Sequence, residues 1–192
     1  MDDSHTPNGK LVVISAPSGA GKTTIAHEIL RRFPQLSFSE SATTRKRRPN
    51  EEDGRDYVFL TTEEFMKRVG DGDFVEWERI FGNCYGTLKS EINRAAREQR
   101  PLLFDVDVRG GLSIKKHYPH ARLIFIRPPN LETLGARLRA RNTEDENTIE
   151  SRLSRAVMEL ELGAAYDCTC VNDELSRAVT EVSEIVSEYL NV

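Results

Sequence analysis

The chain has 192 residues, of which 38% are hydrophobic and 30% are charged, and its formal net charge at pH 7 is -4. This length and apolar content are typical of one domain with its own core. The acidic balance argues against general nucleic-acid binding, and no apolar run approaches the length of a membrane-spanning helix, so neither a nucleic acid nor a membrane is an expected partner.

The N-terminal segment, residues 1–8, is acidic and polar and contains no apolar stretch of the kind found in secretion signals. We expect it to be a disordered lead to a cytoplasmic protein. The cysteines at 84, 168 and 170 are odd in number and have neither zinc-pair nor redox-pair spacing, so we expect free thiols.

A glycine-rich segment follows the apolar run 11–14 and precedes a segment with helical character. A strand, a glycine turn and a helix in this order are typical of a phosphate-binding loop, in which backbone N–H groups and the helix N-terminus point at the anion. Lys22 would neutralise phosphate charge, the Thr23 hydroxyl would reach Mg²⁺, and Gly19 and Gly21 would supply unusual dihedrals. The residues expected to bind ATP here are Ala16, Pro17, Ser18, Gly19, Ala20, Gly21, Lys22, Thr23 and Thr24.

The usual pattern of such a loop begins with glycine, whereas this chain has Ala16. We expect the extra methyl group to fit. The alternative is a chance glycine turn with an exposed lysine, which the flanking strand and helix patterns disfavour.

The helix that begins at Lys22 is expected to end near Arg32, before Pro34, and a short strand at 36–40 follows. Charged and turn residues at 41–57 predict a functional or mobile loop. Its basic run, 45–48, suits a solvated charged surface or a nucleic-acid patch as well as a site for a phosphate ester.

Apolar and acidic residues alternate at 74–78, which predicts a half-exposed strand. We expect its carboxylates to face away from Phe74 and Trp77. On its own, Glu76 could equally be a surface carboxylate. The elements expected around this strand are a strand at 57–60, a short helix at 61–69 opened by a capping box, a loop at 82–87 and a helix at 89–98.

A buried strand at 101–107 ends in two aspartates. In nucleotide-binding α/β domains, a carboxylate in this position lies near Mg²⁺ or its waters, and Asp105 is the candidate. The alternative is that Asp105 and Asp107 merely cap the strand. Strands and helices then alternate to the C-terminus, which predicts an α/β fold with a parallel sheet.

Three arginines, Arg137, Arg139 and Arg141, precede an acidic turn and a long helix. This arrangement resembles a lid on a hinge. Alternatively, the arginines at 137 and 141 form surface salt bridges with Glu144 or Glu146.

Taken together, these motifs resemble the guanylate kinase family from about Gly9 to the C-terminus, because several separated motifs match in order. They are 18–23; 43–45 with Arg48 and Glu51; Gly54 with 56–57; 76–77; 82–87; 105–107 with Gly110; 128–129; Arg137 and Arg141; Arg152; and 171–173.

The resemblance implies a parallel-sheet P-loop core (9–37, 94–136 and 150–192), a GMP-binding α+β insertion at about 38–93 and a helical lid at about 137–149. It implies γ-phosphoryl transfer from ATP to GMP, and to dGMP as well, with Mg²⁺ as cofactor, in a monomer or weak homo-oligomer. ATP and GMP would be its small-molecule partners.

The resemblance also assigns roles to single residues. Catalytic roles fall on Lys22, Arg45, Arg137, Arg141 and Arg152, the metal site on Thr23 and Asp105, and a place near adenine on Asn172. The GMP-binding residues would be Arg45, Arg48, Glu51, Tyr57 and Tyr85 on the phosphate side, and Ser41, Glu76, Thr87 and Asp107 on the guanine side.

Elementary chemistry supports the role of Glu76. Guanine presents N1–H and N2–H₂ side by side, and one carboxylate can accept both, whereas adenine offers an acceptor at N1. Glu76 would therefore set base choice.

The chain departs from the family pattern in two turns, where Arg47 replaces proline, Asn50 replaces glycine and Asn142 lies in the lid turn. Asparagine tolerates left-handed backbone, so we expect both turns to survive. Two other functions remain open: a P-loop kinase of another phosphate ester, such as a ribose bisphosphate, and a catalytically silent guanylate-kinase-like binding module.

Overall fold

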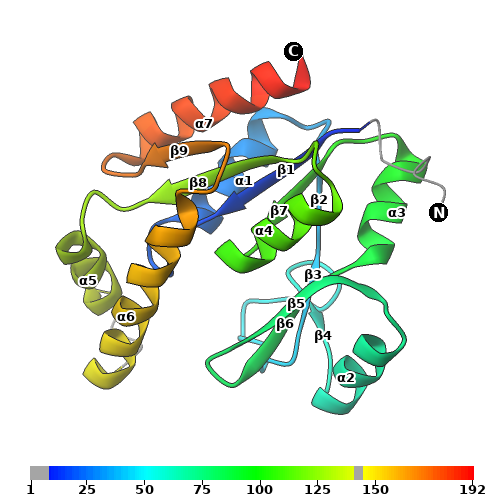
Figure 1. The fold of residues 1–192 in the computed structure, drawn as a ribbon, viewed down its shortest axis with the longest axis horizontal. Helices are drawn as coiled ribbons and strands as arrows, with labels where there is room; N and C mark the ends of the chain where they lie inside the picture. The colour runs from blue at the N-terminus through cyan, green and yellow to red at the C-terminus, as the bar shows by residue number, and fades with distance from the viewer. Residues whose placement is uncertain (1–8, 141–144) are drawn as a thin grey trace.

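The computed structural model describes residues 9–140 and 145–192, and its centre is a sheet of five parallel strands (Figure 1). The largely apolar runs 11–15 and 102–104 are buried at every position, as expected for inner strands of a parallel sheet covered on both sides. The α/β architecture predicted from the alternation of strands and helices is confirmed. In sheet order, the strands are β2 (Ser37–Phe38), β7 (Leu102–Asp105), β1 (Leu11–Ser15), β8 (Arg122–Arg127) and β9 (Cys168–Val171).

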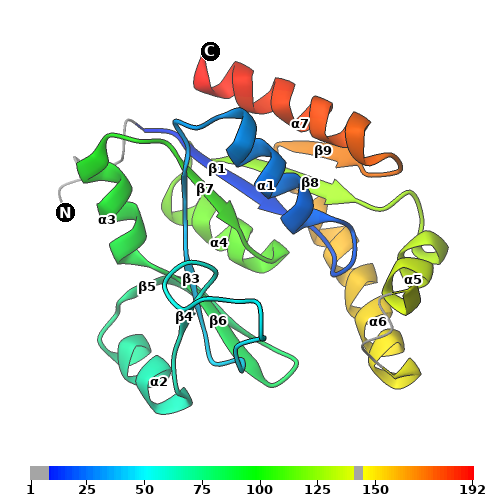
Figure 2. The same cartoon turned by 180° about the vertical axis from the view of Figure 1, so that it is seen from behind.

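Helices cover both faces of this sheet. Figure 1 shows α4 (Val108–His117) in front of it, and the reverse view in Figure 2 shows α1 (Lys22–Arg32) in front, with α7 (Leu175–Leu190) beside it. Alternate residues of β1 serve the two sides: Val12 packs in the cluster that contains α1 and α7, and Val13 packs with α4. Fully burying such a side chain contributes about 1.5–3 kcal/mol.

A second, four-stranded sheet lies below the first in Figure 1, and we call residues 41–88 the small-sheet unit. Its helix α2 (Thr62–Gly70) begins with the predicted capping box, in which Thr61 and Glu64 each accept a backbone N–H of the other. Helix α3 (Lys89–Glu98) leads back to the large sheet. In sheet order, the strands are β4 (Val58–Phe59), β3 (Ser41–Thr43), β6 (Asn83–Leu88) and β5 (Phe74–Ile80).

The prediction of a loop at 82–87 is wrong, because this stretch forms β6, antiparallel to both β3 and β5. Gly86 lies within this strand. A Cβ at Gly86 would lie 2.8 Å from the Glu76 carbonyl oxygen and 2.8 Å from atoms of Phe74 and Trp77. The glycine thus allows a close approach of the neighbouring strand. The polar stretch after Glu40 likewise contains β3, which pairing with β6 stabilises.

An irregularity in β5 between Phe74 and Glu76 decides which way its side chains point. Both Phe74 and Trp77 lie against Phe65 of α2, at ring distances of 4.5 and 6.1 Å. Glu76 instead reaches toward Gly110 of α4. The predicted opposition of carboxylates and aromatic rings is therefore confirmed, and it depends on the extra residue that a β-bulge introduces.

The helices α5 (Leu131–Ala140) and α6 (Glu146–Gly163) pack together at one side of the large sheet (Figure 1). The predicted N-terminal lead and the segment 141–144, which includes Arg141 and Asn142, lie outside the described residues. Among the described helices, none has the length and apolar character needed to cross a membrane.

Candidate active site

A cavity of about 370 Å³ lies where the carboxyl ends of β1 and β7 face the small-sheet unit. Carboxyl ends of parallel strands meet at one edge of the sheet, which is where α/β folds bind ligands. Most of the predicted site residues gather here. Those that line the cavity are Ala16, Pro17, Ser18, Gly19, Gly21, Lys22, Thr23, Thr24, Ser41, Arg45, Arg48, Tyr57, Glu76, Tyr85, Asp105, Asp107 and Arg152.

The loop between β1 and α1 has the backbone that the sequence predicts. Gly19 and Gly21 have φ values of 92° and 94°, a region that side chains disfavour. Ala16 is 5% exposed, and it is not among the positive-φ residues of the described chain, so its methyl group fits. Helix α1 begins at Lys22, and its first residues line the cavity. A helix N-terminus in this position attracts anions.

Asp105 connects the two side chains that follow the glycine loop. The Lys22 ammonium forms an ion pair with Asp105 and donates to the carbonyl of Val106 at 3.1 Å. The Thr23 hydroxyl donates to Asp105 Oδ2 at 3.0 Å. Burial lowers the pKa of Lys22, but the Asp105 carboxylate outweighs burial and leaves that pKa above its ordinary value. Lys22 is therefore a fixed positive charge at the floor of the cavity.

The loop at 44–57 presents Arg45 between aromatic rings. Its guanidinium makes a bidentate bond to Glu51, at 3.0 and 2.8 Å, and lies 5.2 Å from the centre of the Tyr57 ring. Glu51 also accepts the backbone N–H of Arg48 at 2.8 Å, which closes the turn. Glu51 does not line this cavity. Its contacts indicate that it orients Arg45 and the turn that carries Arg48.

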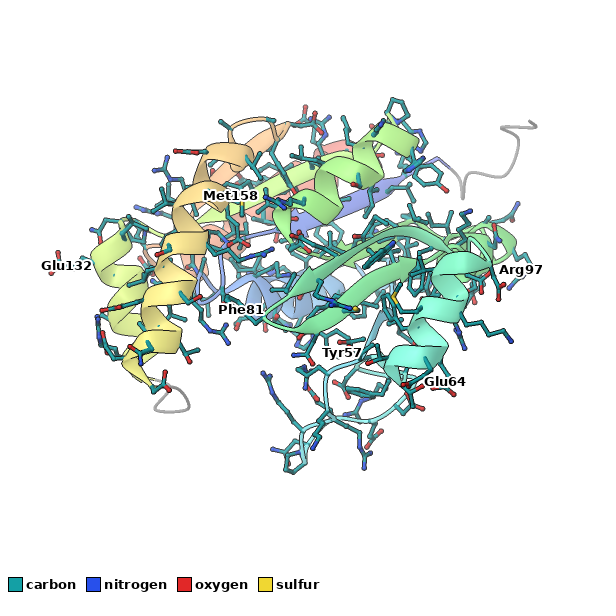
Figure 3. The ribbon with its side chains drawn as sticks, turned by 60° about the horizontal axis from the view of Figure 1, so that its bottom comes forward. Tyr57, Glu64, Phe81, Arg97, Glu132 and Met158 are labelled. Carbon is teal, nitrogen blue, oxygen red and sulfur yellow. The ribbon has the colours of Figure 1, made fainter. Side chains whose placement is uncertain are left out.

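Tyr57 and Tyr85 lie side by side, with ring centres 6.4 Å apart. Burial raises the pKa of Tyr57, and the Asp105 carboxylate raises it further, so this phenol stays protonated and can donate. Figure 3 shows Tyr57 on the small-sheet side of the site. Two guanidiniums and two phenols form a donor set that suits a dianionic phosphate.

The two departures from the family pattern in this loop do not need special backbone. Neither Arg47 nor Asn50 is among the positive-φ residues of the described chain, so the tolerance of asparagine for left-handed backbone is not used at Asn50. Arg47 donates to the carbonyl of Glu51 at 3.2 Å, which fastens the turn that proline would have stiffened. The third departure, Asn142, lies outside the described residues.

Glu76 is held in a closely fitted pocket. The Thr87 hydroxyl, which is fully buried, donates to Glu76 Oε1 at 2.7 Å. On the other side, a Cβ at Gly110 would lie 2.8 Å from Glu76 Oε2, so only glycine leaves this space open. Burial raises the pKa of Glu76 to about 7; the bond from Thr87 opposes the rise and the charge of Asp107 adds to it. A carboxylate with this pKa has few hydrogen-bond donors around it, so it suits a ligand that supplies two N–H donors.

Thr87 does not line the cavity, so its contact is with Glu76. Ser41 is its register partner on β3 and does line the cavity. Asp107 caps α4, accepting the N–H groups of Arg109 at 2.8 Å and Gly110 at 3.1 Å. Because Asp107 also faces the cavity, capping and ligand binding are compatible.

Two predicted residues, Asn172 and Arg137, pack behind the phosphate loop. Asn172 is 5% exposed and donates to the carbonyl of Ala20 at 2.7 Å, and Arg137 donates to the carbonyl of Asn172 at 2.9 Å. A Cβ at Gly21 would lie 2.3 Å from the Asn172 amide nitrogen. These contacts hold the back of the loop, and contact of Asn172 with adenine stays a prediction.

Arg152 on α6 reaches the phosphate loop, where it donates to the Ser18 hydroxyl. Its guanidinium also lies 5.3 Å from the centre of the Phe81 ring. The other predicted arginine of the lid, Arg141, is outside the described residues. Glu146, one predicted surface partner of Arg137 or Arg141, pairs with Arg139.

Among the side chains of the site that sequence reasoning missed are Glu78, Phe81, Arg155 and Glu159. All except Glu78 line the cavity, and Glu78 pairs with Arg155. The available clue was spacing, since Arg155 follows Arg152 by one helical turn and Glu78 follows Glu76 on the same face of a strand.

Known proteins resemble this chain in sequence and in structure. The family model for guanylate kinase matches residues 8–189. The chain is 45% identical to the guanylate kinase of Chlorobaculum tepidum, over 95% of this chain and 94% of that protein, and 46% identical to that of Thermotoga maritima, over 93% and 86%. The crystal structure of guanylate kinase from Anaplasma phagocytophilum is similar with a TM-score of 0.77 and 29% identity, over 94% of this chain and 85% of that one. The similarity therefore spans both sheets and the helices beside them.

Proposed function

The chain belongs to the guanylate kinase family, whose members phosphorylate GMP with ATP, and from this premise we propose how the cavity divides that work. GMP binds on the side of the small-sheet unit, and the ATP phosphates bind on the loop at 16–24. The observation that carries the proposal is that one cavity contains both Glu76 and Lys22. A base acceptor and a phosphate cradle in one cavity suit two nucleotides whose phosphates meet between them.

The GMP half has two parts. Glu76 accepts N1–H and N2–H₂ of guanine, while Ser41 and Asp107 complete the base pocket and Thr87 orients Glu76. Arg45, Arg48, Tyr57 and Tyr85 hold the GMP phosphate, and Glu51 orients Arg45. The bidentate bond from Arg45 to Glu51 supports this assignment, because it holds the guanidinium over the Tyr57 ring, which lies beside Tyr85.

In the ATP half, Lys22 and the N–H groups of the loop hold the β- and γ-phosphates. Arg152, with Arg137 and Arg141 from the lid, meets the charge that develops on the transferred group, and Asn172 lies near adenine. Transfer is direct and in line, because positioning and charge stabilisation suffice for phosphoryl transfer. We also propose that the chain divides as its sequence predicts, into a core, a GMP-binding insertion at about 38–93 and a lid at about 137–149.

Mg²⁺ is the cofactor that the family implies, and the residues present fit it. The Thr23 hydroxyl and the Asp105 carboxylate are two hard oxygen donors 3.0 Å apart. Among the described residues there is no group of three or more metal-ligating side chains. Mg²⁺ prefers such sparse sites, completed by substrate phosphates and waters, and when bound it neutralises phosphate charge. Thr23 and Asp105 would hold it.

Direct transfer can be tested by labelling. With γ-labelled ATP and Mg²⁺ but no GMP, the protein should acquire no label, and label should appear in GDP once GMP is added. A labelled protein that passes its phosphate to GMP would contradict direct transfer. We propose further that dGMP is accepted and that the protein is a cytoplasmic monomer or weak homo-oligomer.

The pKa of Glu76 predicts a pH dependence. In the free protein, Glu76 is half ionised at about pH 7, and guanine needs the ionised form. The kcat/KM for GMP should therefore be level above pH 7 and fall about tenfold per pH unit below it, until other groups titrate. The GMP phosphate adds a second fall near its own pKa of about 6. Glu76→Gln should retain only that lower step, and identical profiles for the two proteins would exclude Glu76 as the titrating group.

Closure is expected when both substrates bind. Without nucleotides, the lid around 137–149 and the small-sheet unit should sit apart, and a ligand that touches both should draw them onto the core. Paired labels on α2 and α5 would report the distance with and without a bisubstrate analogue. A distribution that stays the same on adding the analogue would argue against a moving lid.

A further inference from the structure

An ion-pair chain beside the cavity joins the small-sheet unit to α6. Arg155 donates to Glu159 Oε1 at 2.8 Å and to Glu78 Oε2 at 3.3 Å. The side chains of Arg155, Glu78 and Glu159 are 18%, 17% and 6% exposed. A pair this sheltered is screened much less than a surface pair, and loss of one member leaves a charge without its partner.

The position of these ion pairs indicates their function better than their strength does. Glu78 follows Glu76 on the same face of β5, and Arg155 follows Arg152 by one turn on the same face of α6. The bridge from Arg155 to Glu78 therefore connects the strand that carries Glu76 to the helix that carries Arg152.

A second contact runs in parallel. The guanidinium of Arg152 lies 5.3 Å from the ring centre of Phe81, which Figure 3 shows at the end of the β5–β6 hairpin near α6. The hairpin thus meets α6 at two points, one turn apart on the helix. Two points of contact restrain rotation of α6 relative to the hairpin, which a single contact would not.

The charges around the bridge explain why its arginine matters. Burial raises the pKa of Glu78, as does the neighbouring Asp107, while Arg155 lowers it. Burial also raises the pKa of Glu159, and Arg155 again opposes the rise. Arg109 contributes a second cation at 3.4 Å from Glu78, but its side chain is 57% exposed. Arg155 is thus the sheltered cation shared by two carboxylates.

We propose that Arg155 is a positioning residue for phosphoryl transfer: through Glu78 it fixes α6, and so Arg152, relative to the strand that reads guanine. The proposal rests on the proposed roles of Glu76 and Arg152. It makes base recognition and placement of Arg152 parts of one connection, which the bridge fastens once the small-sheet unit lies against α6. Arg155 acts through Arg152, and needs no contact with either nucleotide.

A double-mutant cycle tests this connection. Arg155→Gln and Glu78→Gln should each lower kcat about ten- to a hundredfold, because a displacement of about 1 Å costs that much, and the double variant should lose little more than either single one. Arg155→Lys should recover part of kcat. The affinity for GMP, read from the fluorescence of Trp77, the sole tryptophan, should stay within about threefold of the parent.

The control is Arg31→Gln, which breaks an exposed arginine–glutamate pair on α1 and should leave kcat unchanged. The proposal fails if Arg155→Gln keeps kcat within twofold, if only Arg155→Gln and not Glu78→Gln has an effect, or if the two losses multiply. It also fails if GMP affinity and melting temperature fall in step with kcat, as a purely structural role predicts. Should Arg155→Gln not fold, Glu78→Gln and Arg155→Lys carry the same test. Absence of GMP phosphorylation by the parent protein would instead refute the proposed function.

Discussion

Replacing Lys22 with alanine is expected to abolish phosphoryl transfer while GMP still binds. Lys22 is a partly buried cation at the head of α1, ion-paired with Asp105 at the phosphate loop, whereas all the proposed GMP residues except Asp107 lie on the small-sheet unit. Removing one preorganised group that stabilises transition-state charge costs a factor of about 10²–10³, and Lys22 also helps to bind ATP. We therefore expect turnover to fall about a thousandfold or more.

Turnover is measured beside GMP titration followed through Trp77, which lies on β5 and is independent of the phosphate loop. The titration should give an affinity close to that of the parent protein. Lys116→Ala, which removes an exposed lysine of α4, is the matched control and should be fully active. Near-normal turnover in Lys22→Ala would refute the phosphate-cradle assignment.

Glu76→Gln is expected to lower the efficiency with GMP about ten- to a hundredfold or more. Glutamine keeps the shape, and its oxygen can still accept from Thr87, but it places an NH₂ donor against the donor edge of guanine. At least one charge-assisted hydrogen bond is lost, which corresponds to about 1.5–3 kcal/mol. Discrimination against AMP should shrink, because an amide can donate to N1 of adenine.

The same substitution should stabilise the fold at high pH. Because the pKa of Glu76 is raised to about 7 in the folded protein, ionisation costs stability progressively from about pH 4.5 to 7, and the full cost is present above pH 7. That cost is about 3 kcal/mol at most, and the neutral amide avoids it. If Glu76→Gln unfolds at a higher urea concentration at pH 8 and yet has a low kcat/KM for GMP, its loss of activity is due to guanine recognition and not to unfolding.

The measurements are kcat/KM for GMP and AMP, the KM for ATP, and the midpoint of urea unfolding at pH 8. The KM for ATP should hardly move, since the neighbours of Glu76 are Thr87 and Gly110 rather than residues on the ATP side of the cavity. Glu63→Gln, on the exposed side of α2, is the control and should behave as the parent. Wild-type GMP efficiency with unchanged base preference would show that another group reads guanine.

Local chemistry explains why parts of this protein are predictable from sequence. The glycine dihedrals of the phosphate loop, the capping box at Thr61 and the start of α1 at Lys22 depend on neighbours within a few residues. Asp105 could be placed because the carboxyl ends of parallel strands always meet at one edge.

The features that escaped prediction join residues far apart in the chain. The close approach that Gly86 permits exists only after β5 has paired with β6, and the space that Gly110 leaves for Glu76 exists only after α4 has packed beside β5. Arg155 carries no local sign of its pairing with Glu78, because that contact depends on how the hairpin meets α6. Such contacts depend on how the elements are arranged in space, which the hydrophobic periodicity of the sequence does not predict.

A coupled assay with ATP and Mg²⁺ and a panel of GMP, dGMP, AMP, CMP and UMP tests the central claim most directly. ADP formation should depend on GMP, with dGMP also used and AMP, CMP and UMP giving at most a few per cent of the GMP rate at equal concentration. The same preparation should lose the GMP rate, but not its native melting behaviour, when Lys22 is replaced. Equal rates with the other monophosphates, or no ADP formation with GMP, would contradict the account.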